Sequence, residues 1–288
     1  MLPPAFLDRV RQQLGPEYEA FLASYHRPRA LGLRLNPLKT DRPPILPFTL
    51  SPLPWAAYGF WYPSEERPGL HPWHEAGLYY LQEPSAMAPA ELLGVEPGLR
   101  VLDLCAAPGG KSTQLAAKMR GQGLLVCNEY HPKRAKILSQ NVERMAISNA
   151  LVLQETPERL AKRFPGWFHR VLVDAPCSGE GMFRKDKKMV KAWEEHGPEF
   201  FSRLQRSILT QAAAMLRPGC LYATPTSTMS ASSALMAAKE TITPPKPYTA
   251  KLRASRRCGD ASRYFTPRSA SGMSATMIRA LYMMAASI

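Results

Sequence analysis

Apolar and polar residues alternate through the middle of the chain in a pattern that predicts strands and helices in turn. Short apolar runs, typical of buried strands, are followed by stretches in which apolar residues recur every three or four positions, typical of amphipathic helices. The predicted strands are Arg100–Leu104, Leu124–Asn128, Ala150–Leu153, Arg170–Val173 and Cys220–Ala223, and the predicted helices cover 111–119, 132–145, 157–164 and parts of 189–216. This order predicts an α/β fold with a doubly wound parallel sheet that binds ligands at the carboxyl ends of its strands.

The two ends of the chain have different patterns. Residues 1–75 combine two short helices, separated at Gly15-Pro16, with an alternating strand at Leu31–Leu35 and a connector rich in proline and aromatic residues. We interpret them as a small N-terminal α+β module beside a core of residues 76–224. Residues 225–288 hold nine Lys and Arg but only two acidic residues, and their apolar periodicity is poor. We therefore expect a weakly folded, degenerate C-terminal tail.

The composition narrows the class of protein. The chain has 288 residues, of which 45% are hydrophobic, and a formal net charge of +14, which favours a nucleic-acid partner over a merely basic surface. The N-terminal module either covers one side of the core or binds RNA. The five cysteines form no C-x-x-C pair, so we predict neither a disulfide framework nor a metal site. With no signal-peptide pattern and no membrane-spanning run, we expect a cytoplasmic monomer.

The first predicted core strand leads into the most informative motif, Cys105-Ala106-Ala107-Pro108-Gly109-Gly110-Lys111-Ser112. Small residues and two glycines between a strand and a helix let backbone N–H groups approach a nucleotide-like ligand. The motif differs from G-x-x-x-x-G-K-[ST] because Cys105 stands at the first glycine position, which disfavours a P-loop NTPase. Glu129 ends the next strand, where its carboxylate either accepts hydrogen bonds from ribose hydroxyls or lies on the surface.

A second motif, Asp174-Ala175-Pro176-Cys177-Ser178-Gly179-Glu180-Gly181, follows the fourth predicted strand. Asp174 is suited to hold a nucleobase by its ring nitrogen or amino group. Cys177 is suited to act as a nucleophile or proton-transfer partner, although a lone cysteine also serves as small core filler. The polar, glycine-rich surroundings favour the functional interpretation. The charge run that follows is either a solvated face or a set of RNA phosphate contacts, made by Arg184, Lys185, Lys187 and Lys188.

These two motifs, together with Tyr80-Leu81-Gln82-Glu83-Pro84-Ser85-Ala86-Met87, resemble the NOL1/NOP2/Sun family of RNA cytosine-C5 methyltransferases, and most closely its bacterial ribosomal RNA branch. The resemblance extends from about Leu31 to Tyr222. It implies a Rossmann-like methyltransferase fold, S-adenosylmethionine as cofactor and ribosomal RNA as partner. It also implies that Cys105–Lys111 wrap the methionine end of the cofactor, that Glu129 holds the ribose, and that Arg134 and Thr156 lie near the cofactor. Asp174 then faces both the cofactor and the target base.

The family's chemistry gives the cysteines roles by resemblance. A thiolate adds to carbon 6 of cytosine, which makes carbon 5 electron-rich enough to take the methyl group. In the family the attacking cysteine follows the fifth strand in a Tyr-Ser-Thr-Cys-Thr type segment, while the cysteine at the position of Cys177 assists product release. Here the segment is Leu221-Tyr222-Ala223-Thr224-Pro225-Thr226-Ser227-Thr228, without a cysteine. We expect either a methyltransferase with a disrupted end or a noncatalytic RNA-binding protein that keeps the cofactor pocket.

Overall fold

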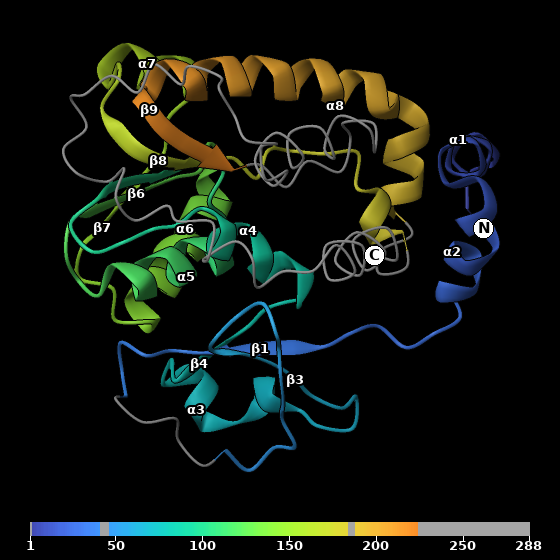
Figure 1. The fold of residues 1–288 in the computed structure, drawn as a ribbon, viewed down its shortest axis with the longest axis horizontal. Helices are drawn as coiled ribbons and strands as arrows, with labels where there is room; N and C mark the ends of the chain where they lie inside the picture. The colour runs from blue at the N-terminus through green and yellow to red at the C-terminus, as the bar shows by residue number, and fades with distance from the viewer. Residues whose placement is uncertain (1, 41–45, 184–187, 224–288) are drawn as a thin grey trace, which may run out of the picture. The chain divides into compact units, whose positions relative to one another are not determined.

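A computed structural model describes residues 2–40, 46–183 and 188–223 of the chain (Figure 1). The chain divides into two compact units. Of the described residues, the larger unit, here called the core unit, takes in 28–40, 46–176 and 204–223. The smaller one, here called the helical unit, takes in 2–27, 177–183 and 188–203. Each unit has its own hydrophobic core.

A five-stranded parallel sheet organises the core unit, with the strand order β7-β6-β5-β8-β9. Its strands are β5 (Arg100–Asp103), β6 (Leu124–Asn128), β7 (Ala150–Leu153), β8 (Phe168–Leu172) and β9 (Leu216–Ala223). The chain runs outward from β5 through β6 to β7, then returns to place β8 on the other side of β5. The carboxyl ends of β5 and β8 therefore flank the switch point at which such sheets bind ligands. The predicted α/β fold with a parallel sheet is confirmed.

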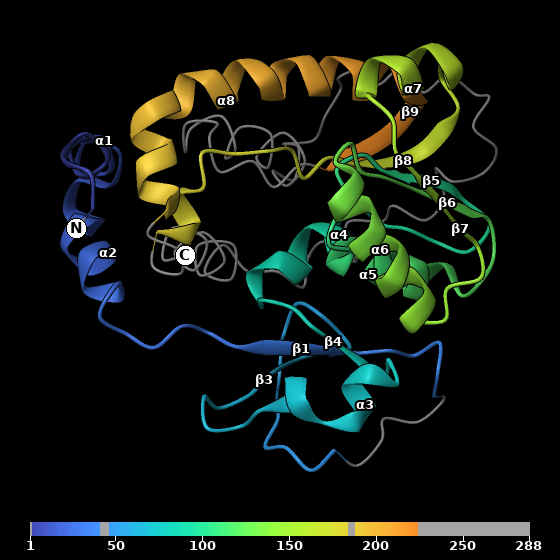
Figure 2. The same ribbon diagram turned by 180° about the vertical axis from the view of Figure 1, so that it is seen from behind.

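Helices cover both faces of this sheet (Figures 1 and 2). They are α4 (Ala88–Leu92), α5 (Gly110–Met119), α6 (Pro132–Arg144), α7 (Pro157–Arg163) and the second half of α8 (Lys188–Met215). Alternate strand residues point to opposite faces. Val101 packs with Leu115 of α5 in one buried cluster, whereas Leu102 packs with Leu160 of α7 in another. Both faces of the sheet are thus covered by apolar clusters, so polar functional side chains are expected at the ends of the strands.

A small antiparallel sheet in the order β2-β3-β1-β4 completes the core unit. It consists of β1 (Gly32–Leu35), β2 (Ser51–Pro52), β3 (Gly59–Trp61) and β4 (Tyr79–Leu81), with α3 (Pro72–Glu75) and the 3-10 turns η2 (Pro68–Leu70) and η3 (Ser85–Met87) along the same stretch. The predicted strand at Leu31–Leu35 is confirmed as β1, and Leu33 pairs with Phe60 and Leu81 on its two sides. The sequence analysis did not predict β2, β3 or β4, because two or three residues are too few to show a strand period.

The helical unit is built around aromatic side chains. It contains α1 (Pro4–Leu14), the 3-10 turn η1 (Gly15–Glu17), α2 (Tyr18–Ser24), the 3-10 turn η4 (Glu180–Met182) and the first half of α8, which bends at Gly197. The ring of Phe6 meets that of Phe183 edge-on at 5.1 Å between centroids, and Trp193 donates a hydrogen bond from Nε1 to Glu180. The predicted helices on either side of Gly15-Pro16 are confirmed. In the described part of the chain, no helix has the length and apolar character needed to span a bilayer.

Candidate active site

The loop between β5 and α5 is shaped by its glycines and held by α6. Gly109 has φ 112°, a conformation that side chains disfavour, and a Cβ on Gly110 would lie 3.2 Å from Cε1 of Tyr80. From α6, Arg134 Nη2 donates to the carbonyl of Ala107 over 2.9 Å, and Asn141 Nδ2 donates to that of Pro108 over 2.8 Å. Side chains of α6 therefore hold the loop through two of its carbonyl groups. The start of α5 is then a suitable place for an anionic or polar ligand group, since backbone N–H groups at a helix start bind such groups.

Glu129 lies at the end of β6 and is connected to this loop through Arg134. Its buried carboxylate forms an ion pair with Arg134 Nη1 at 3.3 Å and accepts a hydrogen bond from the His131 amide at 2.9 Å. Glu129 and Arg134, which the family resemblance implies for the cofactor site, therefore lie together with the loop. Thr156, also predicted near the cofactor, caps α7 by accepting a hydrogen bond from the Arg159 amide at 3.3 Å.

A cavity of about 210 Å³ opens at the carboxyl ends of β5 and β8. Its lining joins three separate sequence motifs and consists of Tyr80, Leu81, Gln82, Glu83, Ala86, Asp103, Cys105, Ala106, Ala107, Pro108, Gly110, Lys111 and Asp174. Lys111 Nζ lies 2.6 Å from Oδ2 of Asp174, so the first residues of α5 are tied to the end of β8. The cavity therefore combines a glycine-bearing loop with a fixed carboxylate.

Asp103 is a candidate site residue that the sequence motifs did not single out. Its carboxyl group is buried, and Oδ2 accepts a hydrogen bond from Ser112 Oγ at 2.7 Å, while Oδ1 has no partner among the described residues. Burial raises the pKa of Asp103 from 3.8 to about 7, and the Ser112 hydrogen bond and Lys111 oppose that rise. Asp103 lines the cavity, and a buried carboxyl group with one oxygen unpartnered among the described residues suits a cationic ligand group. Its position directly before the Cys105 loop was the available clue.

Arg34 of β1 connects the small sheet to the same loop, although no sequence motif points to it. Its buried guanidinium donates to Gln82 Oε1 and the Gly110 carbonyl at 3.0 Å each, and to Thr113 Oγ1 at 2.7 Å. Burial lowers the pKa of Arg34 to about 10. Gln82 lines the cavity, so β1 and β4 together support one of its walls.

The cysteines of the two motifs have different environments. Burial and the nearby carboxylates of Asp103 and Glu129 raise the pKa of Cys105 to about 12, which keeps this thiol neutral and unsuited to nucleophilic attack. Cys177 belongs to the helical unit, where its thiol is exposed and in no disulfide.

The predicted RNA contacts are described only in part. Lys188 is exposed at the start of α8. Arg184, Lys185 and Lys187 lie outside the described residues, as do Thr224–Thr228, where the family's nucleophile is expected.

Comparison with known families gives two adjoining matches. Residues 90–240 match the family described as 16S rRNA methyltransferase RsmB/F, and residues 2–84 match the N-terminal domain of 16S rRNA methyltransferase RsmF. Curated relatives named ribosomal RNA small subunit methyltransferase F include one from Erwinia tasmaniensis, 36% identical over 75% of this chain, and one from Serratia proteamaculans, 37% identical over 80%. The alignments cover 48% and 51% of those proteins, so the chain spans about half the length of the curated relatives it matches.

Solved structures give the same architecture. A methyltransferase homologue from Pyrococcus horikoshii superposes with a TM-score of 0.67 at 25% identity, covering 82% of this chain and 78% of its own. NSun6 from the same organism, solved with SFG, superposes with a TM-score of 0.67 at 15% identity over 83% of this chain and 87% of its own, and that likeness supports the fold alone.

Proposed function

The chain belongs to the RsmB/F family of 16S rRNA methyltransferases, and from this premise we propose that it acts on carbon 5 of a cytosine in ribosomal RNA. Methyltransferases of this family use S-adenosylmethionine as the methyl donor. The observation that carries the proposal is the 210 Å³ cavity, in which the Cys105 loop, the Lys111–Asp174 ion pair and the unpartnered Asp103 oxygen converge.

The residues around this cavity fit S-adenosylmethionine. When bound, the cofactor supplies a methyl group on a positively charged sulfur. Asp103 Oδ1, buried without a partner among the described residues, is suited to accept a hydrogen bond from the ammonium of the methionine part. The backbone of the loop at Cys105–Lys111 would surround that part, and Glu129 would hold the ribose hydroxyls. Arg134 keeps both the loop and Glu129 in place through its two contacts.

The target cytosine requires a carboxylate and a thiol. Asp174 is suited to orient the base, because Lys111 holds its Oδ2 and the carboxyl group remains partly exposed. Thiolate addition to carbon 6 would make carbon 5 nucleophilic enough to take the methyl group, which would leave the sulfonium donor as a neutral thioether. Loss of the carbon-5 proton to a base, with expulsion of the thiolate, would then restore the aromatic ring. Cys177 follows Asp174 by three positions and is the thiol that this motif supplies. Asp174 and Cys177 are our catalytic candidates.

A second candidate function is favoured by one feature of the sequence. The segment Leu221–Thr228 contains no cysteine, so the residue that attacks carbon 6 in the family is missing from the expected position. A chain of this kind would bind cofactor and RNA without turnover. Serine at this segment is no substitute, since its hydroxyl is barely ionised near neutral pH without a dedicated base.

Incubation with labelled S-adenosylmethionine and unmodified small-subunit rRNA, followed by bisulfite mapping, separates the candidates. Methylation at one cytosine that disappears in Cys177→Ala would establish catalysis with Cys177 as nucleophile. Cofactor binding without 5-methylcytosine would support the second, noncatalytic candidate and contradict the first. Absence of both cofactor binding and methylation would contradict both candidates.

The RNA partner is tested through salt dependence. If Arg184, Lys185, Lys187 and Lys188 contact phosphates, RNA affinity should fall steeply with salt, and replacing all four by glutamine should flatten that dependence. An unchanged slope would place the RNA elsewhere. We propose that the protein works as a cytoplasmic monomer on this substrate.

A further inference from the structure

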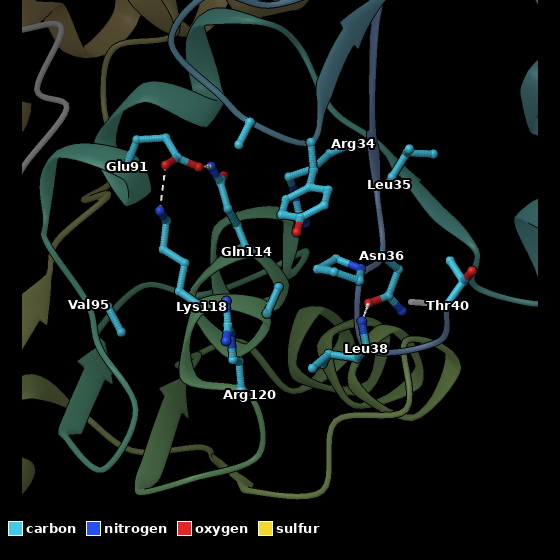
Figure 3. A pocket seen from close by; sticks show the side chains of 14 residues that line it. Arg34, Leu35, Asn36, Leu38, Thr40, Glu91, Val95, Gln114, Lys118 and Arg120 are labelled. Carbon is cyan, nitrogen blue, oxygen red and sulfur yellow. Dashed lines mark hydrogen bonds and ion pairs between the residues drawn. The ribbon is translucent and has the colours of Figure 1, made fainter. Parts of the chain in front are cut away.

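A second cavity lies in the core unit beside the second half of α5 (Figure 3). Its volume is about 610 Å³, within the range of about 300–1,000 Å³ typical of small-molecule sites. Residues 34–40 form one wall, the turn at Ala57 and Tyr58 forms another, and Glu91 of α4 and the α5 residues form the third. The described residues that line it are different from those that line the 210 Å³ cavity.

Most polar groups of the walls already have partners within the protein. Lys118 Nζ pairs with Oε2 of Glu91, and Gln114 Nε2 donates to Oε1 of the same carboxylate at 2.8 Å, as the dashed lines in Figure 3 show. The Arg34 guanidinium donates hydrogen bonds to Gln82 and to the Gly110 carbonyl. These groups build a preformed wall in which each polar side chain named here has a partner within the protein.

Two side chains in this cavity differ from the rest. Tyr58 is 44% exposed and Arg120 is also exposed, and neither side chain has a hydrogen bond or ion pair in the part of the chain that the structure describes. Arg120 follows α5 in the left-handed conformation, with φ 50° and ψ 41°, where glycine is the favoured residue. The local backbone therefore gives no reason for an arginine here. With Arg34 and Lys118 opposed only by Glu91, the charged residues of the lining are net positive.

We propose that this cavity binds one nucleotide of the RNA, with its base stacked on Tyr58 and a phosphate at Arg120. The proposal rests on the RNA substrate proposed above. A cavity lined by both an exposed aromatic ring and a free guanidinium suits single-stranded nucleic acid, because every base has a face that can stack and every nucleotide carries a phosphate. The ten residues of α5 span about 15 Å between the Cys105 loop and Arg120. That length corresponds to about four or five stacked nucleotides, so we place the bound nucleotide on the same strand, several positions from the target.

Fluorescence anisotropy with a labelled single-stranded fragment of small-subunit rRNA tests this site. We expect Tyr58→Ala to weaken binding by about tenfold and Tyr58→Phe, which keeps the ring, to restore it. Arg120→Gly should weaken binding and reduce the salt slope by about 0.7, while its melting temperature stays the same or rises. Lys162→Gln removes one exposed charge from α7 and serves as the matched control, with a smaller effect on affinity.

Photocrosslinking with 4-thiouridine in the same RNA locates the contact. Crosslinks to the peptide around Tyr58 that excess unlabelled RNA removes, and that free adenosine monophosphate does not remove, would support an RNA site. RNA that binds with unchanged affinity to Tyr58→Ala and Arg120→Gly and crosslinks elsewhere would overturn the inference but leave the proposed function intact. Competition by free adenosine monophosphate at this cavity, without an effect of either variant on RNA affinity, would assign the site to a free nucleotide and also overturn it. Failure of the wild-type chain to bind any RNA would contradict both proposals.

Discussion

Replacement of the buried Asp103 carboxyl by an amide should raise the stability of the protein, relative to wild type, more at pH 8 than at pH 5, and should weaken its cofactor site. In the unfolded chain this carboxyl ionises near its ordinary pKa of 3.8, whereas burial raises the pKa to about 7 in the folded protein. The native state therefore holds a proton that the unfolded state releases, and stability is lost as the pH rises from about 4 to 7. At 1.36 kcal/mol per pKa unit, the ionised group costs up to about 4 kcal/mol at pH 8 but only about 1.5 kcal/mol at pH 5.

Asp103→Asn removes this pH-dependent cost. The amide itself leaves an N–H group without a partner where Oδ1 stood, at a cost of roughly 1–3 kcal/mol that does not vary with pH. Relative to wild type, the free energy of unfolding of Asp103→Asn should therefore increase by about 2–3 kcal/mol between pH 5 and pH 8. Urea unfolding of the ligand-free proteins, followed by circular dichroism at both pH values, measures this difference.

Two results would refute this reasoning. An equal difference between variant and wild type at pH 5 and pH 8 would mean that the folded Asp103 does not hold its proton. Unchanged affinity for S-adenosylmethionine in Asp103→Asn would mean that Oδ1 does not accept from the cofactor, since loss of a charged acceptor should cost about 1.5–3 kcal/mol. Asp8→Asn changes an exposed carboxyl in the same way and serves as the control.

Two further substitutions test how the units are built. Gly109→Ala places a side chain at φ 112°, so we expect about 1–3 kcal/mol lower stability and weaker cofactor binding, measured by thermal unfolding and calorimetry. Unchanged values would mean that the loop conformation differs. Phe6→Ala empties the aromatic core of the helical unit and should cost about 3–5 kcal/mol. Hydrogen exchange should then show lost protection in α1 but not in β5, and equal loss in both would contradict separate units.

The parallel sheet could be predicted from the sequence because its strands are apolar runs between periodic helices. The bounds of β6 and β7 agree with the prediction. β9 begins at Leu216, four residues before the predicted Cys220, because Pro218 and Gly219 suggest a turn although they lie within the strand. The sequence therefore predicts which elements exist better than where they begin.

Features that depend on long-range pairing could not be predicted in this way. The Lys111–Asp174 ion pair joins residues 63 positions apart and exists because β8 returns to the side of β5. β3 is defined by its pairing with β1 and not by its own three residues. Asp103 Oδ1 has no partner among the described residues because several elements pack around it at once. The sequence alone does not reveal such packing.

Calorimetric titration of the folded chain with S-adenosylmethionine at pH 8 tests the central claim most directly, because every role proposed for the 210 Å³ cavity requires the cofactor. We predict saturable binding at one site, weakened by roughly 1–3 kcal/mol in Glu129→Ala, which leaves Arg134 and the His131 amide without their carboxylate partner. Absence of binding up to millimolar cofactor, by protein shown to be folded, would contradict the account.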